Sequence, residues 1–131
     1  MTATTLNEAQ LIALVETYFA AVDRKDVAGT LACFAPSARF SIANHGVHYD
    51  GRDTEVRGMY ERLNERYAQV WHGAFTHTVD VAAQRIASRF RVENVNHQGE
   101  KLVKNNCNFF ELKDGLFAAV FVYMTGENSL S

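Results

Sequence analysis

The alternation of hydrophobic and polar positions divides the chain into a helical first half and a β-rich second half. From Asn7 to Asp23, apolar residues recur at steps of three and four, which predicts an amphipathic helix with one buried face. Thr5 with Glu8, or Asn7 with Gln10, could cap its start. The apolar face comprises Leu11, Leu14, Val15, Tyr18, Phe19 and Val22.

Two further helices are predicted before residue 75. The first follows Asp26, a suitable N-cap for residues 27–34, and is expected to stop at Pro36. The second starts near Asp53 and opposes an apolar face to a charged, solvated one. Its apolar face comprises Val56, Tyr60, Leu63, Tyr67 and Val70.

The remaining patterns predict strands. The turn residues Asp114 and Gly115 suit a tight hairpin, and His45-Gly46 suits another turn. Two short strands (38–43 and 47–49) and four long ones (75–83, 85–97, 101–112 and 116–124) are expected. Helices that precede a run of consecutive strands favour an α+β fold, with three N-terminal helices packed on a curved antiparallel sheet.

Composition, charge and residue spacing disfavour several classes of function. The 131 residues suit one domain, and a formal charge of −2 with mixed signs leaves no basic footprint for nucleic acid. No apolar run of ~18 residues predicts a membrane span, and the start lacks a signal peptide, so a cytoplasmic protein is expected. Cys33 and Cys107 are expected to be buried free thiols. The spacing of the histidines predicts no metal site.

Three segments together resemble a known superfamily. They are an aromatic helix leading through an acidic turn into a strand (18–40), a glycine-led helix entry (49–63) and a closing hairpin (108–124). Their order is similar to that of the nuclear transport factor 2-like superfamily, which includes ketosteroid isomerases and SnoaL-like cyclases. The resemblance implies a cone-shaped α+β barrel around a ligand pocket. Many unrelated functions share this fold, so the chemistry must be argued from the site.

The resemblance also implies a catalytic set. Dehydratase-like members place a histidine at the start of the first long strand and an aspartate at the end of the first helix, which here read His77 and Asp23. A tyrosine five residues before that aspartate reads Tyr18. An acid in the last turn of a helix opposes the helix dipole, and Asp26 is the better cap, so Asp23 lacks a local role. A solvated acid, a structural histidine and a core tyrosine are the alternatives.

Other positions depart from the ketosteroid isomerases. Residues 42–45 contain no acid, and neither Cys107 nor Asn108 is one, which disfavours the two-carboxylate mechanism of those enzymes. Asn106 is a further ligand-facing amide candidate. Substrate-binding candidates are Asn44, His48, Tyr60, Trp71, Phe90, Asn108 and Phe110, with His72 and Glu93 as weaker ones.

Two functions remain open. The first is a cofactor-independent lyase or isomerase acting on a small apolar organic molecule, in which His77 takes a proton, Asp23 orients the imidazole and Tyr18 stabilises an oxyanion. The second is a non-catalytic module that binds a small ligand or a partner.

Both functions are compatible with the same predicted cavity and the same predicted dimer. A cavity of more than about 100 Å³ is expected between the first helix, the third helix and the sheet. The last strand is apolar on both faces, with Phe117, Ala119 and Phe121 predicted on one of them, so a homodimer is expected to cover the outer face. The residues expected to line this cavity or to lie just beneath it are Leu14, Tyr18, Tyr60, Leu63, Phe90 and Phe110.

Overall fold

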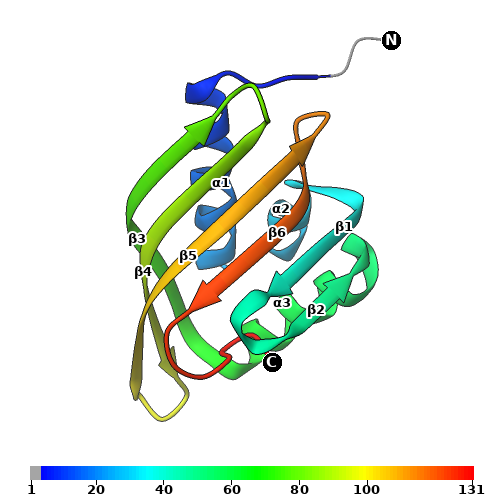
Figure 1. Cartoon of the computed structure of the whole chain (residues 1–131). Helices are drawn as coiled ribbons and strands as arrows, with labels where there is room; N and C mark the ends of the chain where they lie inside the picture. Colours follow the sequence, from blue (N-terminus) through cyan, green and yellow to red (C-terminus); the bar gives the residue numbers. More distant parts are fainter. Residues whose placement is uncertain (1–3) are drawn as a thin grey trace.

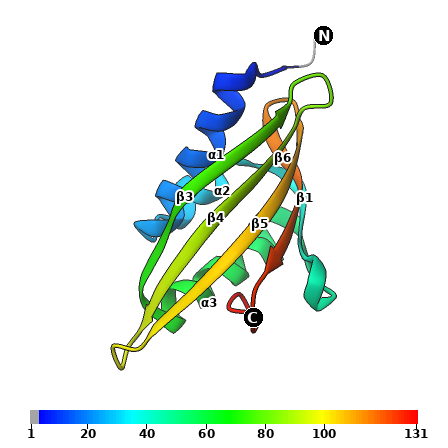
Figure 2. The same ribbon diagram turned by 60° about the vertical axis from the view of Figure 1, so that its left-hand side comes forward.

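A computed structural model describes residues 4–131 and shows three α-helices on one face of a curved six-stranded sheet (Figures 1 and 2). The α+β prediction is therefore confirmed. The helices are α1 (Glu8–Asp23), α2 (Val27–Leu31) and α3 (Arg57–Arg66), with a 3₁₀ turn at Ala43–His45 and a π-helical turn at Gly51–Val56. The strands are β1 (Phe34–Ile42), β2 (Val47–Asp50), β3 (Tyr67–Asp80), β4 (Arg85–Asn96), β5 (Lys101–Lys113) and β6 (Leu116–Met124).

The strands lie in the order β2-β1-β6-β5-β4-β3. Each neighbouring pair is antiparallel except β1 and β6, which run parallel, so the prediction of a wholly antiparallel sheet is wrong at this pair. These two strands are far apart along the chain, and no hairpin fixes their relative direction. The Asp114-Gly115 turn joins β5 to β6 as predicted, with both residues at positive φ.

Side chains at the helix starts select between the predicted caps. Asn7 accepts a hydrogen bond from the Gln10 backbone N–H at 2.8 Å, and the Gln10 side chain accepts one from the Asn7 N–H at 2.9 Å. Asp26 caps α2 by accepting from the Gly29 N–H at 2.9 Å. Both caps satisfy backbone donors that a helix start would otherwise leave unpaired.

The short helix α2 stops earlier than predicted. It ends at Leu31, and Pro36 lies inside β1, whose pairing with β6 is interrupted between Phe34 and Arg39. A proline in that interruption removes no ladder hydrogen bond, because the backbone there is not paired. The strand therefore starts four residues before the predicted position.

The third helix is also shorter than predicted, and this error changes which histidine lies near the start of β3. Tyr67 and Val70, expected on the helix face, belong to β3. A bulge in β3 between Tyr67 and Gln69 shifts the strand alternation, so that two buried positions three residues apart imitate a helical spacing. As a result β3 begins eight residues before the predicted Phe75, and His72 lies within the strand.

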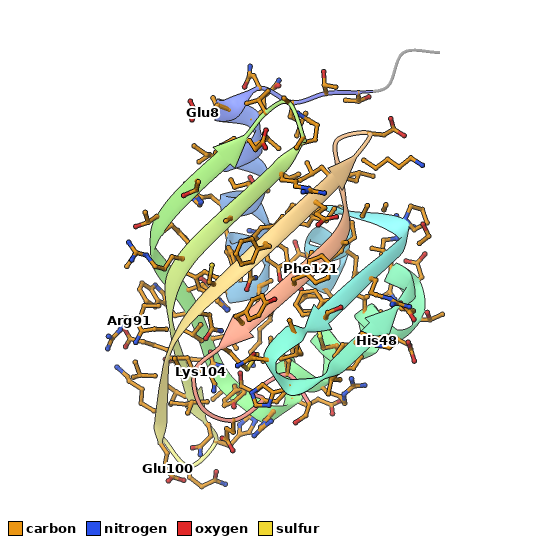
Figure 3. The ribbon with its side chains drawn as sticks, viewed as in Figure 1. Glu8, His48, Arg91, Glu100, Lys104 and Phe121 are labelled. Atoms are coloured by element: carbon orange, nitrogen blue, oxygen red, sulfur yellow. The ribbon has the colours of Figure 1, made fainter. Side chains whose placement is uncertain are left out.

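The two faces of the sheet differ in character. The face toward the helices is a buried aromatic core, while Phe109 and Tyr123 are exposed on the other face. Phe121 lies on this outer face of β6 (Figure 3). Phe117 points inward instead of sharing its face with Phe121, because a bulge beside Leu112 shifts the alternation. None of the helices within residues 4–131 is long and apolar enough to cross a membrane.

The cap of α1 gives the first prediction. Asn7→Ala should lower the free energy of unfolding by about 0.5–2 kcal/mol, because the capping box at the start of α1 is lost. Asn7→Ser keeps an oxygen in the same place and should match the wild type closely. Urea denaturation of the three proteins measures the difference. Equal stability of Asn7→Ala and Asn7→Ser would contradict the assigned cap.

Candidate active site

The last residue of α1 meets the first half of β3 through an acid–histidine pair. The Asp23 Oδ1 atom lies 2.6 Å from Nδ1 of His72, and its Oδ2 atom accepts from the His72 backbone N–H at 3.1 Å. One carboxylate therefore holds both the main chain and the ring of His72. With Nδ1–H donated to Asp23, Nε2 is left as the basic nitrogen, and it has no hydrogen-bond partner among residues 4–131.

The two cationic residues that follow Asp23 bind other partners, so its carboxylate is available to contact His72. Arg24 pairs with Asp26 at 3.2 Å. Lys25, at a positive φ of 60°, directs its Nζ to the carbonyls of Asn64 (3.0 Å) and Tyr67 (2.5 Å). These contacts tie the turn after α1 to the start of β3. The Asp23 and His72 side chains are 23% and 12% exposed, so the pair is shielded from bulk water on most sides.

The His72 ring lines a cavity between the helices and the sheet. Its volume is about 30 Å³, below the 100 Å³ expected, so the size prediction is wrong. The predicted Tyr18, Tyr60, Leu63 and Phe90 line it, and Phe110 lies beneath, packed on Tyr18, whereas Leu14 does not line it. Bulky aromatic side chains fill most of the cone, and Ser129 and Leu130 from the C-terminal tail also line the space. The remainder has room for one or two waters.

Two tyrosines place hydroxyl groups in this cavity. The hydroxyls of Tyr18 and Tyr60 are hydrogen-bonded to each other, and both rings are buried. Burial raises the pKa of Tyr18 well above its usual value, and the pKa of Tyr60 is raised for the same reason. Both phenols are therefore protonated at neutral pH. One donates to the other, which leaves one hydroxyl proton for a further acceptor.

The C-terminal tail (residues 125–131) closes one end of the cavity. Lys104, only 1% exposed, donates from Nζ to the carbonyls of Thr125 and Glu127, near the lower end of the sheet in Figure 3. Burial lowers the pKa of this amine. Arg66 donates to the Asn128 carbonyl at 3.4 Å. The tail is thus held by polar contacts at its base, while Leu130 supplies an apolar contact inside.

His77 does not meet Asp23, so the predicted contact between these two residues is wrong. Its Nδ1 lies 2.8 Å from Oγ of Ser88, and its Nε2 lies 3.0 Å from Oε2 of Glu16. The ring also stacks on Phe75. The physical reason is the early start of β3: the histidine near the beginning of the strand is His72. His77 meets α1 two turns before Asp23, at Glu16, and links the helix to the sheet.

Other predicted binding residues lie outside the cavity. Asn44 clamps β6 by a pair of hydrogen bonds to the Met124 backbone, at 2.8 and 3.2 Å. His48 is exposed on β2 at the sheet edge (Figure 3), and Trp71 is 43% exposed on an outer groove. Phe110 is fully buried beneath the cavity. Glu93 pairs with Lys101 on the surface at 2.9 Å.

Three asparagines also face the cavity, and two of them were singled out by the sequence. Asn108 and Asn106 line the floor from β5, as their alternation with Phe110 suggested. Asn94 lines it from β4 and gave no signal in the sequence. In the part of the chain that the structure describes, no group of three or more His, Cys, Asp or Glu side chains is arranged to hold a metal ion.

Comparison with known proteins identifies similar chains. A family model described as the SnoaL-like domain matches residues 3–124. A candidate polyketide cyclase from Xanthomonas campestris pv. campestris is 24% identical, with a TM-score of 0.80 over 90% of this chain and 92% of the other. PrhC from Penicillium brasilianum is 18% identical, with a TM-score of 0.79 over 88% and 80%.

A third structure broadens the comparison. A hypothetical protein from Catenulispora acidiphila, solved with trimethylamine and described by its ketosteroid isomerase-like fold, has a TM-score of 0.74 at 11% identity, over 84% of this chain and 83% of that one. No functionally curated protein matches the sequence. At these identities the solved structures show a shared fold, and the resemblance expected from the sequence is confirmed.

The contacts of His77 predict a structural role. His77→Ala should lower the free energy of unfolding by about 1–3 kcal/mol, because the buried hydroxyl of Ser88 loses its partner. Adding Ser88→Ala should recover part of that loss, since the unpaired hydroxyl is then gone. Urea denaturation measures both effects. A His77→Ala variant as stable as the wild type would refute the role, and Glu16→Gln, at an exposed position, should change stability little.

Proposed function

The chain belongs to the SnoaL-like domain family, and on that premise we propose that it is a cofactor-independent lyase or isomerase. In this proposal His72 moves a proton on a small organic molecule. The observation that carries the proposal is the Asp23–His72 pair, whose imidazole lines the cavity together with the Tyr18 and Tyr60 hydroxyls. A histidine held by a carboxylate beside buried hydroxyl donors is a common arrangement for general acid–base catalysis.

The proton transfer follows from the roles of each group. Nε2 of His72 takes a proton from a carbon next to a carbonyl or imine, so that a C–H bond breaks and an N–H bond forms. The electron pair moves onto the carbonyl oxygen or imine nitrogen. Asp23 stabilises the imidazolium that results, and the available tyrosine proton hydrogen-bonds the developing negative charge.

Either of two second steps completes the reaction. In an isomerase, the imidazolium returns the proton to a different carbon, and the electron pair moves back to form the new double bond. In a lyase, a leaving group on the neighbouring carbon departs with the bonding pair and takes the proton from Nε2. In both cases His72 ends in its starting state and no redox change occurs, so no cofactor is required.

Substrate entry requires a change at the closed end of the cavity. About 30 Å³ holds water and no organic molecule, so Leu130 must withdraw before a ligand binds. The tail that carries Leu130 is held mainly through backbone carbonyls, by Lys104 and Arg66. The buried Lys104 amine fixes only Thr125 and Glu127. Residues 128–131 are held by longer contacts from Arg66 (3.4 Å) and the Tyr49 hydroxyl (3.3 Å), so this last segment is the part of the lining that opens most easily.

The alternative is a non-catalytic ligand-binding module. The small resting cavity does not separate the two functions, since a bound ligand needs the same rearrangement as a substrate. The relatives include candidate polyketide cyclases, which supports the catalytic class. The absence of an acid at Cys107 and Asn108 sets the protein apart from the two-carboxylate isomerases. Activity that depends on the His72 imidazole distinguishes the enzyme from the binding module.

The catalytic proposal predicts activity on a generic base-sensitive probe. With 5-nitrobenzisoxazole, whose ring opens when a base removes one proton, the wild type should show a saturable rate. His72→Ala should lower that rate by roughly 10²–10⁴-fold, the usual effect of removing a general base. Asp23→Asn should lower it less, because the imidazole is still present but no longer stabilised when protonated.

A matched control completes the experiment. His48→Ala removes an exposed histidine far from the cavity and should leave the rate unchanged. Leu130→Ala widens the closed end and should raise the rate of a protein that keeps the Asp23–His72 pair. If His72→Ala left the rate unchanged both in the wild-type chain and in the Leu130→Ala chain, the catalytic proposal would be refuted and the binding module favoured.

We also propose that the outer face of the sheet pairs with a second copy of the chain. Phe109 and Tyr123 pack edge to face there, at 5.8 Å between ring centroids, while both remain nearly half exposed. Phe121 lies in the same apolar groove. A patch of large apolar side chains on one sheet face is typical of an interface.

The interface proposal predicts a dimer at micromolar concentration. Phe109→Lys should convert it into a monomer, because a charge would be buried at the centre of the interface. Val81→Lys, at an equally exposed apolar position in the β3–β4 turn, should leave the dimer intact. Sedimentation velocity measures the mass of each protein. A wild type that sediments as a monomer would contradict the proposal.

A further inference from the structure

The floor of the cavity carries three polar atoms without partners. The side chains of Asn94, Asn106 and Asn108 are buried, and none of their Oδ1 atoms accepts a hydrogen bond from the residues that the structure describes, 4–131. All three side chains line the cavity. A buried carbonyl without a donor destabilises the fold, and proteins retain such groups chiefly where a ligand or water uses them.

The neighbours of the two central amides cannot satisfy them. Asn106 lies opposite Phe90 on β4 and Met124 on β6, which have no donor in their side chains. Asn108 lies opposite Val122 and Ser88, and the Ser88 hydroxyl is already engaged with His77. The two positions are two residues apart on one face of β5, which separates them by about 7 Å.

The chemistry of the lining limits what can donate to these oxygens. No Lys, Arg, Asp or Glu side chain among residues 4–131 lines the cavity, so neither an anion nor a cation finds a charged partner on its walls. The amide oxygens would repel a carboxylate. The rest of the lining is largely aromatic and aliphatic, with Phe40, Phe90 and Tyr60 among its walls.

We propose that the cavity binds a compact neutral molecule, about one ring in size, whose two or more hydroxyl groups donate to the Oδ1 atoms of Asn106 and Asn108. This inference rests on the proposed function in placing the ligand beside His72. That histidine lies on β3, two strands and about 10 Å across the sheet from β5, and level with Lys104, so Asn106 lies about 7 Å and Asn108 about 14 Å further along the sheet. The hydroxyl that donates to Asn106 is therefore the one nearer His72, and a substituent on the ring carries the C–H bond toward Nε2.

Asn94 supplies a third acceptor at a different level of the sheet. It lies opposite Val70 on β3 and Leu102 on β5, four residues along β4 from Phe90. Its side chain also contacts the Tyr67 hydroxyl, which can donate to the amide oxygen, so Asn94 does not require a ligand donor. The two acceptors on β5 select for a substrate with hydrogen-bond donors over an ether or hydrocarbon of similar shape.

The test compares a ring that carries two hydroxyl donors with a ring in which methyl groups cap both oxygens. Binding of 1,3-dihydroxybenzene and of 1,3-dimethoxybenzene is followed by NMR of the asparagine side-chain amides, in the full-length wild type and in Leu130→Ala. The diol should bind and shift the Asn106 and Asn108 signals. The diether, which can only accept, should bind at least about 10-fold more weakly, as expected when two hydrogen bonds are lost.

Variants on one strand assign the effect. Asn106→Leu and Asn108→Leu should each weaken diol binding by about 3- to 10-fold and should not lower the melting temperature, because the unpaired carbonyl is replaced by an apolar group. Asn105→Leu, on the exposed face of the same strand, should bind the diol like the wild type. The melting curves of these variants distinguish loss of binding from loss of structure.

Several outcomes would overturn the inference. They are equal affinity for the two rings, no diol binding in either the wild type or Leu130→Ala, or undiminished binding in both asparagine variants. The result is separate from the catalytic proposal, since His72→Ala should still prefer the diol to the diether. If the protein preferred the diol but the ring opening of 5-nitrobenzisoxazole did not depend on His72, the ligand class would stand and the catalytic proposal would be refuted.

Discussion

The contact between Asp23 and His72 fixes the geometry on which the site depends. One oxygen of the carboxylate holds the backbone of β3 and the other holds the ring, so helix and strand cannot slide past each other without breaking both bonds. The Glu16–His77 contact repeats the same type of link two turns earlier along α1. Tyr18 lies between these two links on the helix, and its hydroxyl is therefore placed in the cavity by the same constraint.

The sequence predicts the elements better than their ends. Periodicity identified α1, and residue type identified the cap at Asp26 and the Asp-Gly hairpin, because each of these features depends on local chemistry. It failed at β3, where a bulge after Tyr67 made a strand imitate a helix. A bulge is set by how two distant strands pair, so no local pattern reports it.

That single boundary error explains why the predicted contact between His77 and Asp23 is wrong. The family pattern places a histidine early in the first long strand, and a strand thought to begin at Phe75 pointed to His77 instead of His72. Tyr18 lines the cavity as predicted, and Asp23 does contact a strand histidine, because a helix places residues five apart at a predictable angle. The size of the cavity was beyond sequence reasoning, since it depends on how Leu130 packs against residues far away in the chain.

The interior combines a feature that lowers stability with one that offsets part of that loss. Unpaired amide oxygens lower stability, while Leu130 buries apolar surface over them and restores part of it. A ring that displaces Leu130 replaces its apolar contacts, and hydroxyl groups on that ring also satisfy the amides, which Leu130 cannot do. A plain hydrocarbon would gain only apolar contacts, which are similar to those that Leu130 makes, so it would gain little free energy by displacing Leu130. The closed cavity therefore favours donors over mere apolar bulk, and the tail contributes to selectivity by setting the affinity that a ligand must exceed.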